Sequence, residues 1–233
     1  MANIKLGGTT AITESGGVVT FVNAGGLRSM QVFTSTGTST WTKPAGITTI
    51  KVFCTGGGGG GGGHGAADDL GAAGGGGGTA IKIYDVSSTA SVVVTVGAGG
   101  LGKSGMVHGL IGVASSFPGP GQTITGNPGD GGKQGNAGPV LGGSGGTATG
   151  GDLNLIGGDG GNGLDENVAT ASGYLSAYGV GGATFWGGGG RGASHTTAAR
   201  EGQNYGTGGG GGSEGSTAGK DGKSGVVVIE EYS

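Results

Sequence analysis

The chain of 233 residues lacks several features that mark whole classes of protein. Its one cysteine, Cys54, excludes an internal disulfide framework and a zinc cluster of the usual kind. The longest purely aliphatic stretch, Val226–Ile229, is far shorter than the ~18 residues that a membrane span needs. With 11 Lys+Arg against 14 Asp+Glu and no basic run, the chain lacks the charge of a nucleic-acid binder. The first residues lack an apolar secretory core, so we expect no signal peptide.

Apolar and aromatic side chains are also scarce. Hydrophobic residues make up 33% of the chain and aromatic residues 5%, against an apolar share of roughly 45–50% in ordinary domains. One conventional hydrophobic core therefore cannot organise the whole chain. Glycine takes the place of those side chains, with 69 residues. Because such a composition is typical of low-complexity segments, a flexible linker is the alternative to an ordered structure.

Glycine is unevenly spread along the chain. Residues 1–55 hold 8 glycines and residues 56–225 hold the other 61. The glycine-poor stretches are rich in β-branched and aromatic residues, which favours strands, and no stretch has a capped helical period. We predict a hairpin over Ala11–Asn23 and further strands at Met30–Thr34, Thr38–Thr42, Ile47–Thr55, Thr79–Val86, Ser91–Val96 and Gly225–Tyr232.

Within the long excursion from Gly97 to Ser224, glycine often recurs at every third residue. The clearest run is Gly126, Gly129, Gly132, Gly135 and Gly138. An extended helix of the polyproline II type has three residues per turn, so glycine at each third position leaves one edge bare. Neighbouring backbones can then approach and hydrogen-bond to one another. We therefore predict an all-β fold with polyglycine II: a small antiparallel β-scaffold carrying a bundle of polyglycine II helices, with almost no α-helix.

One stretch matches a nucleotide-binding motif. Gly97–Ser104 fits the P-loop pattern and directly follows an apolar strand. In a chain so rich in glycine, however, such a match arises easily by chance. A P-loop must also lead into a helix whose N-terminus binds phosphate, and the next residues carry Gly105, Gly109 and Gly112. We therefore expect no nucleotide cofactor.

Metal-binding and catalytic patterns are equally weak. Gly157–Asp165 fits one calcium-binding nonapeptide repeat, but such sites form between stacked repeats and the next nine residues do not continue the pattern. His64, His108 and His195 lie far apart in the sequence, in no metal-ligand spacing. No nucleophile, base and orienting group can be recognised together. We expect no metal, no cofactor and no enzymatic activity.

Side chains suited to recognition are concentrated between the glycine runs. Leu164–Trp186 and Arg191–Tyr205 hold most of the aromatic residues and the only arginines of the long excursion. Such residues dominate binding hot spots, and rigid scaffolds often carry recognition loops. The candidate receptor-binding residues are Tyr174, Tyr178, Phe185, Trp186, Arg191, Arg200 and Tyr205. For Phe185 and Trp186, the alternative is that they cap an apolar end of the bundle.

Several landmarks in chain order resemble those of a known family. They are Phe33–Gly46 (FTSTGTSTWTKPAG), Ile47–Cys54, Gly56–Gly63, Val92–Gly100, Ala114–Phe117 and Gly225–Tyr232. Over about residues 30–233, the chain is similar to glycine-rich phage tail-fibre domains. The distal adhesins of T-even-like phages are similar in alternating glycine stretches with variable segments, folded as a polyglycine II sandwich. This resemblance implies binding of a bacterial surface receptor through the variable tips.

The distribution of glycine along the chain, together with the resemblance, predicts an organisation. We expect residues 1–27 to serve in attachment or oligomerisation, with a homotrimer as one arrangement. Residues 28–96 would form the β-scaffold with a first glycine-rich excursion, residues 97–224 the bundle with exposed tips, and residues 225–233 the closing strand. Unlike the distal adhesins, this chain is expected to have no long attachment domain.

Partners and location follow from the same resemblance. The receptor would be a bacterial glycan or outer-membrane protein, and other virion proteins would bind residues 1–27. From the charge balance and the short aliphatic stretches, we expect neither nucleic acid nor membrane insertion to be involved. The protein would be made in the host cytoplasm and reside on a virion fibre. The main alternative is a structural fibre or decoration component without specific receptor binding. Ice binding is disfavoured, because the irregular segments carrying Tyr, Trp and Arg do not suit a flat, regular array.

Overall fold

The computed structural model describes most of the chain with its side chains and a shorter N-terminal part by its backbone only. Residues 26–64, 70–135, 139–163, 179–193, 197–213 and 218–233 are described in full, and 2–6, 9–15 and 18–21 by their backbone. The described residues are all-β without a helix, as the sequence predicts. Accordingly, no described segment is a helix long and apolar enough to cross a membrane.

A small three-stranded antiparallel sheet precedes the rest. It consists of β1 (Ala2–Leu6), β2 (Thr9–Ser15) and β3 (Val18–Phe21), in that spatial order. The β2–β3 hairpin, paired from Ile12↔Phe21 to Ser15↔Val18, is the hairpin predicted over Ala11–Asn23.

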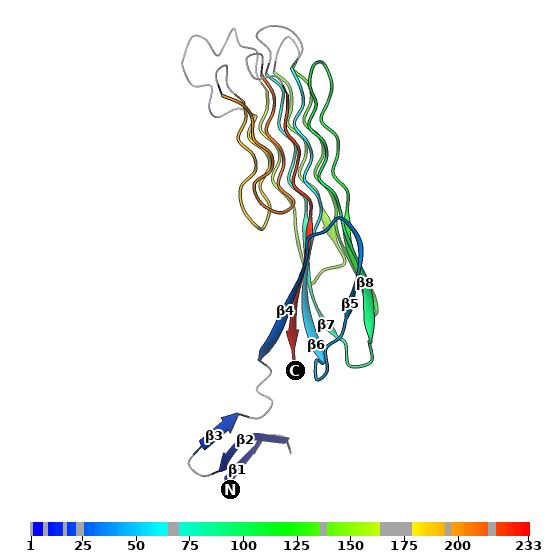
Figure 1. Cartoon of the computed structure of the whole chain (residues 1–233), viewed down its shortest axis with the longest axis vertical. Helices are drawn as coiled ribbons and strands as arrows, with labels where there is room; N and C mark the ends of the chain where they lie inside the picture. Colours follow the sequence, from blue (N-terminus) through cyan, green and yellow to red (C-terminus); the bar gives the residue numbers. More distant parts are fainter. Residues whose placement is uncertain are drawn as a thin grey trace.

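Two five-stranded antiparallel sheets form a sandwich (Figure 1). The first sheet has the order β11–β10–β9–β8–β5, with β5 at Gly37–Thr42, β8 at Ser91–Val96, β9 at Ser115–Gly119, β10 at Gln122–Gly126 and β11 at Ala148–Thr149. The second has the order β12–β7–β6–β13–β4, with β4 at Leu27–Phe33, β6 at Thr49–Thr55, β7 at Thr79–Asp85, β12 at Leu153–Leu155 and β13 at Val226–Tyr232. β13 therefore brings the end of the chain into the middle of this sheet.

The space between the sheets is a conventional hydrophobic core. Alternate residues of each strand point into it, so that Ile50 and Val52 of β6 are fully buried while Lys51 between them is partly exposed. At the centre, the rings of Trp41 and Phe117 meet edge to face with centroids 6.4 Å apart. Burial of these apolar side chains is the main force that holds the sandwich together.

One buried carboxylate lies at the edge of this core. Glu231 has no solvent exposure and accepts hydrogen bonds from Trp41 Nε1 and Gln31 Nε2, both at 2.7 Å, and from the hydroxyl of Ser29. These donors come from β4 and β5, which belong to different sheets. Glu231 on β13 therefore links the two sheets through neutral donors.

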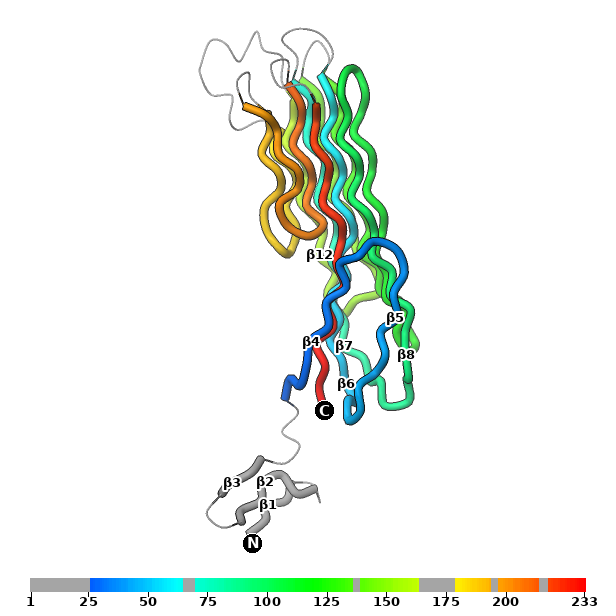
Figure 2. The backbone as a smooth tube through the Cα atoms, in the orientation of Figure 1, coloured from blue at the N-terminus to red at the C-terminus, as the bar shows by residue number. Residues whose placement is uncertain are grey.

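Beyond the sandwich, glycine-rich segments run side by side along the long axis of the molecule (Figures 1 and 2). We call them the glycine bundle. Its segments are 56–63, 70–78, 97–103, 107–113, 127–135, 139–147, 156–163, 179–183, 188–193, 197–202, 206–213 and 218–225. Segment 56–63 continues β6 directly, so the bundle grows out of the sandwich without a linker.

Backbone hydrogen bonds within the bundle follow a three-residue step. In segment 56–63, Gly56, Gly59 and Gly62 donate to segment 70–78. Gly57, Gly60 and Gly63 donate to segment 107–113, and the two remaining amides donate to segment 218–225. The carbonyl groups accept with the same step from three further segments, 97–103, 127–135 and 206–213. Segment 56–63 thus has six hydrogen-bonded neighbours, which no flat β-sheet provides.

Segments 70–78 and 206–213 also have six such neighbours each, and they bond to 56–63 and to each other. These three segments form the centre of the bundle, and the other nine surround them. The centre coincides with the densest glycine runs, including Gly56–Gly63 and Gly208–Gly212. Surrounding segments carry side chains at one or two of every three positions, because they have fewer neighbouring backbones and their remaining edges face solvent.

The glycines are required for close approach rather than for unusual dihedral angles. Among the described glycines only eight have positive φ, and these lie at turns or segment ends, for example Gly105 at +63°. By contrast, a Cβ built on Gly129 or Gly132 would collide with the backbone carbonyl of Gly75 or Ala72. The amide of Gly132 donates to the carbonyl of Gly60 at 2.9 Å. A side chain there would push apart the segments that these hydrogen bonds join.

The predicted strands between residues 27 and 96 and at the end of the chain are confirmed. The step of three also agrees with the packing expected from the glycine spacing, although the assignment as polyglycine II stays a prediction. One feature was not anticipated. The long excursion returns to the sandwich at β9–β10 and again at β11–β12, so residues 115–126 belong to the sandwich sheets.

Candidate functional site

Two of the candidate receptor-binding residues pack where the bundle meets the sandwich. The ring of Trp186 lies 5.9 Å from that of Phe53 on β6, and its indole Nε1 donates to Thr55 Oγ1 at 2.8 Å. Phe185 stacks on the same Phe53 with a centroid distance of 5.8 Å, yet its side chain is 51% exposed. These contacts give both residues a packing role on the outer face of the second sheet, which corresponds to the capping alternative.

The other described candidates lie along one corner of the bundle. Arg191 and Arg200 are exposed on neighbouring segments, and the Arg200 amide donates to the Arg191 carbonyl at 2.9 Å. Tyr205 is 36% exposed at the end of the bundle next to the sandwich, where its carbonyl accepts from the hydroxyl of Thr184. Nε and Nη2 of Arg191 donate to the Ala198 carbonyl at 3.4 and 3.3 Å. This corner therefore presents two exposed guanidinium groups, one of which is held against the backbone. Tyr174 and Tyr178, like Gly138, lie outside the described residues.

The P-loop-like stretch is one of the bundle segments. The amides of Gly100 and Lys103 donate to the carbonyls of Gly58 and Gly61, and the Gly102 amide donates to Asp221 Oδ1 at 2.7 Å. A turn with Gly105 at positive φ follows, and then segment 107–113. Amides that a P-loop would direct at phosphate are here bonded to the protein itself.

The calcium-like nonapeptide also uses its side chains internally. Asp159 Oδ1 accepts from the amide of Gly145 at 2.8 Å, and Asn162 Oδ1 accepts from the amide of Gly142 at 3.0 Å. The step of three between donors is matched by a step of three between acceptors. At these positions the side-chain oxygens accept the hydrogen bonds that, in the interior of the bundle, the backbone carbonyls of a neighbouring segment accept. In the described ranges, no three His, Cys, Asp or Glu side chains are grouped so as to hold a metal ion.

The single thiol is also unsuited to chemistry. Cys54 is fully buried at the end of β6, and burial raises the pKa of its thiol to about 12. A thiol that stays protonated near neutral pH is a poor nucleophile and a poor metal ligand. Cys54 therefore acts as a small apolar residue of the core.

A second exposed surface is apolar, a property that the sequence analysis did not predict. Segments 97–103 and 107–113 are neighbours, since the Leu110 amide donates to the Leu101 carbonyl at 2.9 Å. They and the turn between them expose large apolar side chains to about half of their area: Leu101, Met106, Val107, Leu110, Ile111 and Val113. Val107, Leu110 and Val113 repeat with the step of three, and Gly109 and Gly112 repeat with the same step one residue before Leu110 and Val113. This pairing of two repeats is the signal that could have revealed the apolar surface. Corners of one scaffold therefore differ sharply: one is apolar and another cationic.

Comparison with known proteins adds one finding. A family model described as a glycine-rich domain matches residues 34–232, which is most of the chain. A search of curated proteins returns no match. The matched range begins directly after β4 and takes in the other nine strands of the sandwich and the whole glycine bundle. The chain therefore belongs to the glycine-rich domain family.

Proposed function

We propose that this protein is a phage fibre adhesin that recognises a bacterial surface receptor through residues at the surface of its glycine bundle. The observation that carries this proposal is that the backbone holds the bundle together, whereas its larger side chains lie at the surface. The centre of the bundle consists of hydrogen-bonded glycine backbone, so its surface residues can change without disturbing the packing. Such a scaffold suits recognition of variable receptors.

The cationic corner is the described surface best suited to this role. The planar guanidinium group of Arg200 can bind phosphate or carboxylate in a bidentate manner. Arg191, whose Nε and Nη2 donate to the Ala198 carbonyl, keeps its outer N–H groups for the same ligand. Bacterial surface glycans offer both groups, together with C–H faces on which an aromatic ring such as that of Tyr205 can pack. Tyr174 and Tyr178 are included as candidate receptor-binding residues on the basis of the sequence alone.

The test is whether the purified protein binds bacteria and competes with phage adsorption. Fluorescently labelled protein would be added to a panel of Gram-negative cells, with the double variant Arg191→Ala/Arg200→Ala and the single variants Tyr205→Ala and Tyr178→Ala. We expect each to reduce cell binding about tenfold or more while the melting temperature stays nearly constant, because truncating a central anchor typically costs ~2 kcal/mol of binding free energy.

The matched control is Lys133→Ala. It removes an exposed cation from a different part of the bundle surface, so binding should be unchanged. If no cell type binds the wild-type protein, the adhesin proposal fails and the structural fibre or decoration role is favoured. If binding is lost only together with folding, the substituted residues serve packing.

A further inference from the structure

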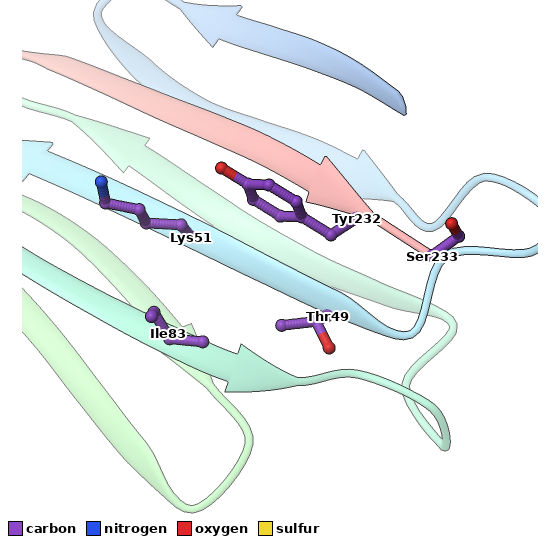
Figure 3. Close-up of a pocket in the computed structure, with 5 residues that line it drawn as sticks. All are labelled: Thr49, Lys51, Ile83, Tyr232 and Ser233. Atoms are coloured by element: carbon purple, nitrogen blue, oxygen red, sulfur yellow. The ribbon is translucent and has the colours of Figure 1, made fainter. Parts of the chain in front are cut away.

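The outer face of the second sheet contains a trough that belongs to neither the bundle nor the core. It has a volume of about 260 Å³ and is lined by Thr49, Lys51, Ile83, Tyr232 and Ser233. In Figure 3, Tyr232 on β13 and Ile83 on β7 flank Thr49 and Lys51 on the intervening strand β6. Thr49 pairs directly with Tyr232, and Lys51 pairs with Ile83.

The trough exists because a small residue stands between larger ones. Thr49 forms the floor, the ring of Tyr232 forms one wall, and Ile83, which is 59% exposed, forms the other. Neighbours at alternate positions, such as Ile50 and Tyr84, point into the core and hold the strands in place. The walls are therefore fixed by the sandwich rather than by a loop.

Polar groups at the rim are already positioned. The hydroxyl of Tyr232 donates to Glu230 Oε2 at 2.7 Å, and Lys51 Nζ lies 4.0 Å from the same oxygen. The hydrogen bond to Glu230 raises the pKa of Tyr232 above its ordinary value, so the hydroxyl stays protonated and keeps its lone pairs for a ligand O–H. Lys51 and Glu230 place opposite charges beside the trough, and the exposed Asp85, which pairs with Thr49, adds a second carboxylate. The surroundings therefore disfavour an anionic ligand.

We propose that this trough binds a single neutral saccharide ring. A sugar presents an apolar C–H face and a rim of hydroxyl groups, and the trough offers an aromatic wall, an aliphatic wall, hydroxyls, an ammonium group and a carboxylate. The volume is somewhat smaller than the ~300–1,000 Å³ of pockets for drug-sized ligands, which limits the ligand to about one ring. A buried apolar anchor from a protein partner would leave these polar groups unpaired.

The experiment is a titration of the purified protein followed by amide ¹H–¹⁵N spectra. Glucose, galactose, N-acetylglucosamine and rhamnose are the probes, each raised stepwise to well above an expected Kd on the order of 1 mM. We expect at least one sugar to shift the amides of residues 49–51, 83 and 230–233 in a saturable way. Thr49→Trp, which fills the trough, should abolish these shifts, and Lys51→Met should weaken binding about threefold to tenfold.

The control is Val93→Trp, which adds the same large side chain at an exposed position of β8 in the other sheet. It should leave the titration unchanged. The proposal is overturned if none of the sugars shifts the trough amides, or if the shifts survive in Thr49→Trp. It is also overturned if these amides shift with protein concentration alone, since the trough would then be a contact between copies of the chain. The proposal is independent of the adhesin function, whose test uses cells and variants of the bundle.

Discussion

The sandwich and the glycine bundle solve the problem of folding in opposite ways. The sandwich buries large side chains, with Trp41 and Phe117 at its centre. Its backbone hydrogen bonds lie within two sheets, in which each strand has at most two neighbours. The bundle has almost no side chain at its centre and directs the hydrogen bonds of each central segment to six neighbours. One region therefore depends on apolar surface removed from water, and the other on backbone contact that a Cβ on the contacting glycines would obstruct.

The two regions are joined by more than chain continuity. β6 passes directly into the central segment 56–63, and at this junction the hydroxyls of Thr55 and Thr79 lie 2.9 Å apart in a buried hydrogen bond. Trp186 reaches back from the bundle to the same Thr55. A destabilising substitution in either region should therefore also destabilise the other, and the following variants measure the size of this effect.

The largest effect is expected at the centre of the bundle. In Gly60→Val, the new Cβ would meet the Leu101 backbone carbonyl and lie 2.6 Å from the Gly102 nitrogen, so neighbouring segments must separate and lose hydrogen bonds. We expect the free energy of unfolding to fall by about 4 kcal/mol, from overpacking together with unpaired buried backbone groups. Guanidinium unfolding would measure this, and Gly132→Val should act similarly.

Gly188→Val is the matched control for the bundle. It adds the same side chain to a surrounding segment where nothing lies within 4 Å of the new Cβ, so it should change stability by less than about 0.5 kcal/mol. Equal effects at positions 60 and 188 would contradict the distinction between centre and surface.

The next largest effect is expected at the buried carboxylate of the sandwich. Glu231→Ala leaves the donors of Trp41, Gln31 and Ser29 without their acceptor, which should lower the free energy of unfolding by about 3 kcal/mol. Glu231→Gln keeps one acceptor oxygen and should lose less. Thermal unfolding of both variants would rank them, and a smaller loss in the alanine variant would show that the hydrogen bonds contribute little.

A smaller effect is expected at the junction. Trp186→Ala removes the ring packed on Phe53 and the hydrogen bond to Thr55, and should cost about 2 kcal/mol, because the ring is only partly buried. Phe185→Ala, whose ring is half exposed, should cost about 1 kcal/mol. Cell binding measured on the same variants separates packing from recognition: a loss of binding by a variant with unchanged stability would assign that residue to the receptor site.

The smallest effect concerns an ion pair at the edge of the sandwich. Asp152 Oδ1 accepts from Lys82 Nζ at 2.6 Å and its other oxygen accepts from the Ile83 amide, which together hold the pKa of Asp152 below its ordinary value of 3.8. A lowered pKa stabilises the fold above that ordinary value, and the contribution is lost as the pH falls through the lower folded value. Asp152→Asn should therefore reduce the loss of stability on acidification slightly, as measured by melting temperature against pH. An unchanged acid profile would show that the exposed pair contributes nothing.

Much of the fold follows from local patterns in the sequence. β-branched stretches such as Thr49–Thr55 and Ser91–Val96 specify strands by their composition, and turns follow from glycines such as Gly46 at positive φ. The step of three through Gly129 and Gly132 indicates backbone contact on one edge. These features depend on a few consecutive residues, so they can be predicted from the sequence.

The tertiary structure alone decided which segments meet. Consecutive glycines such as Gly59 and Gly60 are chemically identical, yet one donates to segment 70–78 and the next to segment 107–113. Nothing in a bare backbone distinguishes these directions, so the partners are set by the loops and by the strands from which each segment starts. The same reason explains why Phe185 and Trp186, grouped in sequence with candidates for recognition, lie against Phe53. It also explains the trough, whose residues come from three strands that long-range pairing brings together. The composition of the chain determined that its glycine-rich backbones would pack closely. The pairing of distant segments determined which side chains lie next to one another, because it depends on contacts that no local pattern encodes.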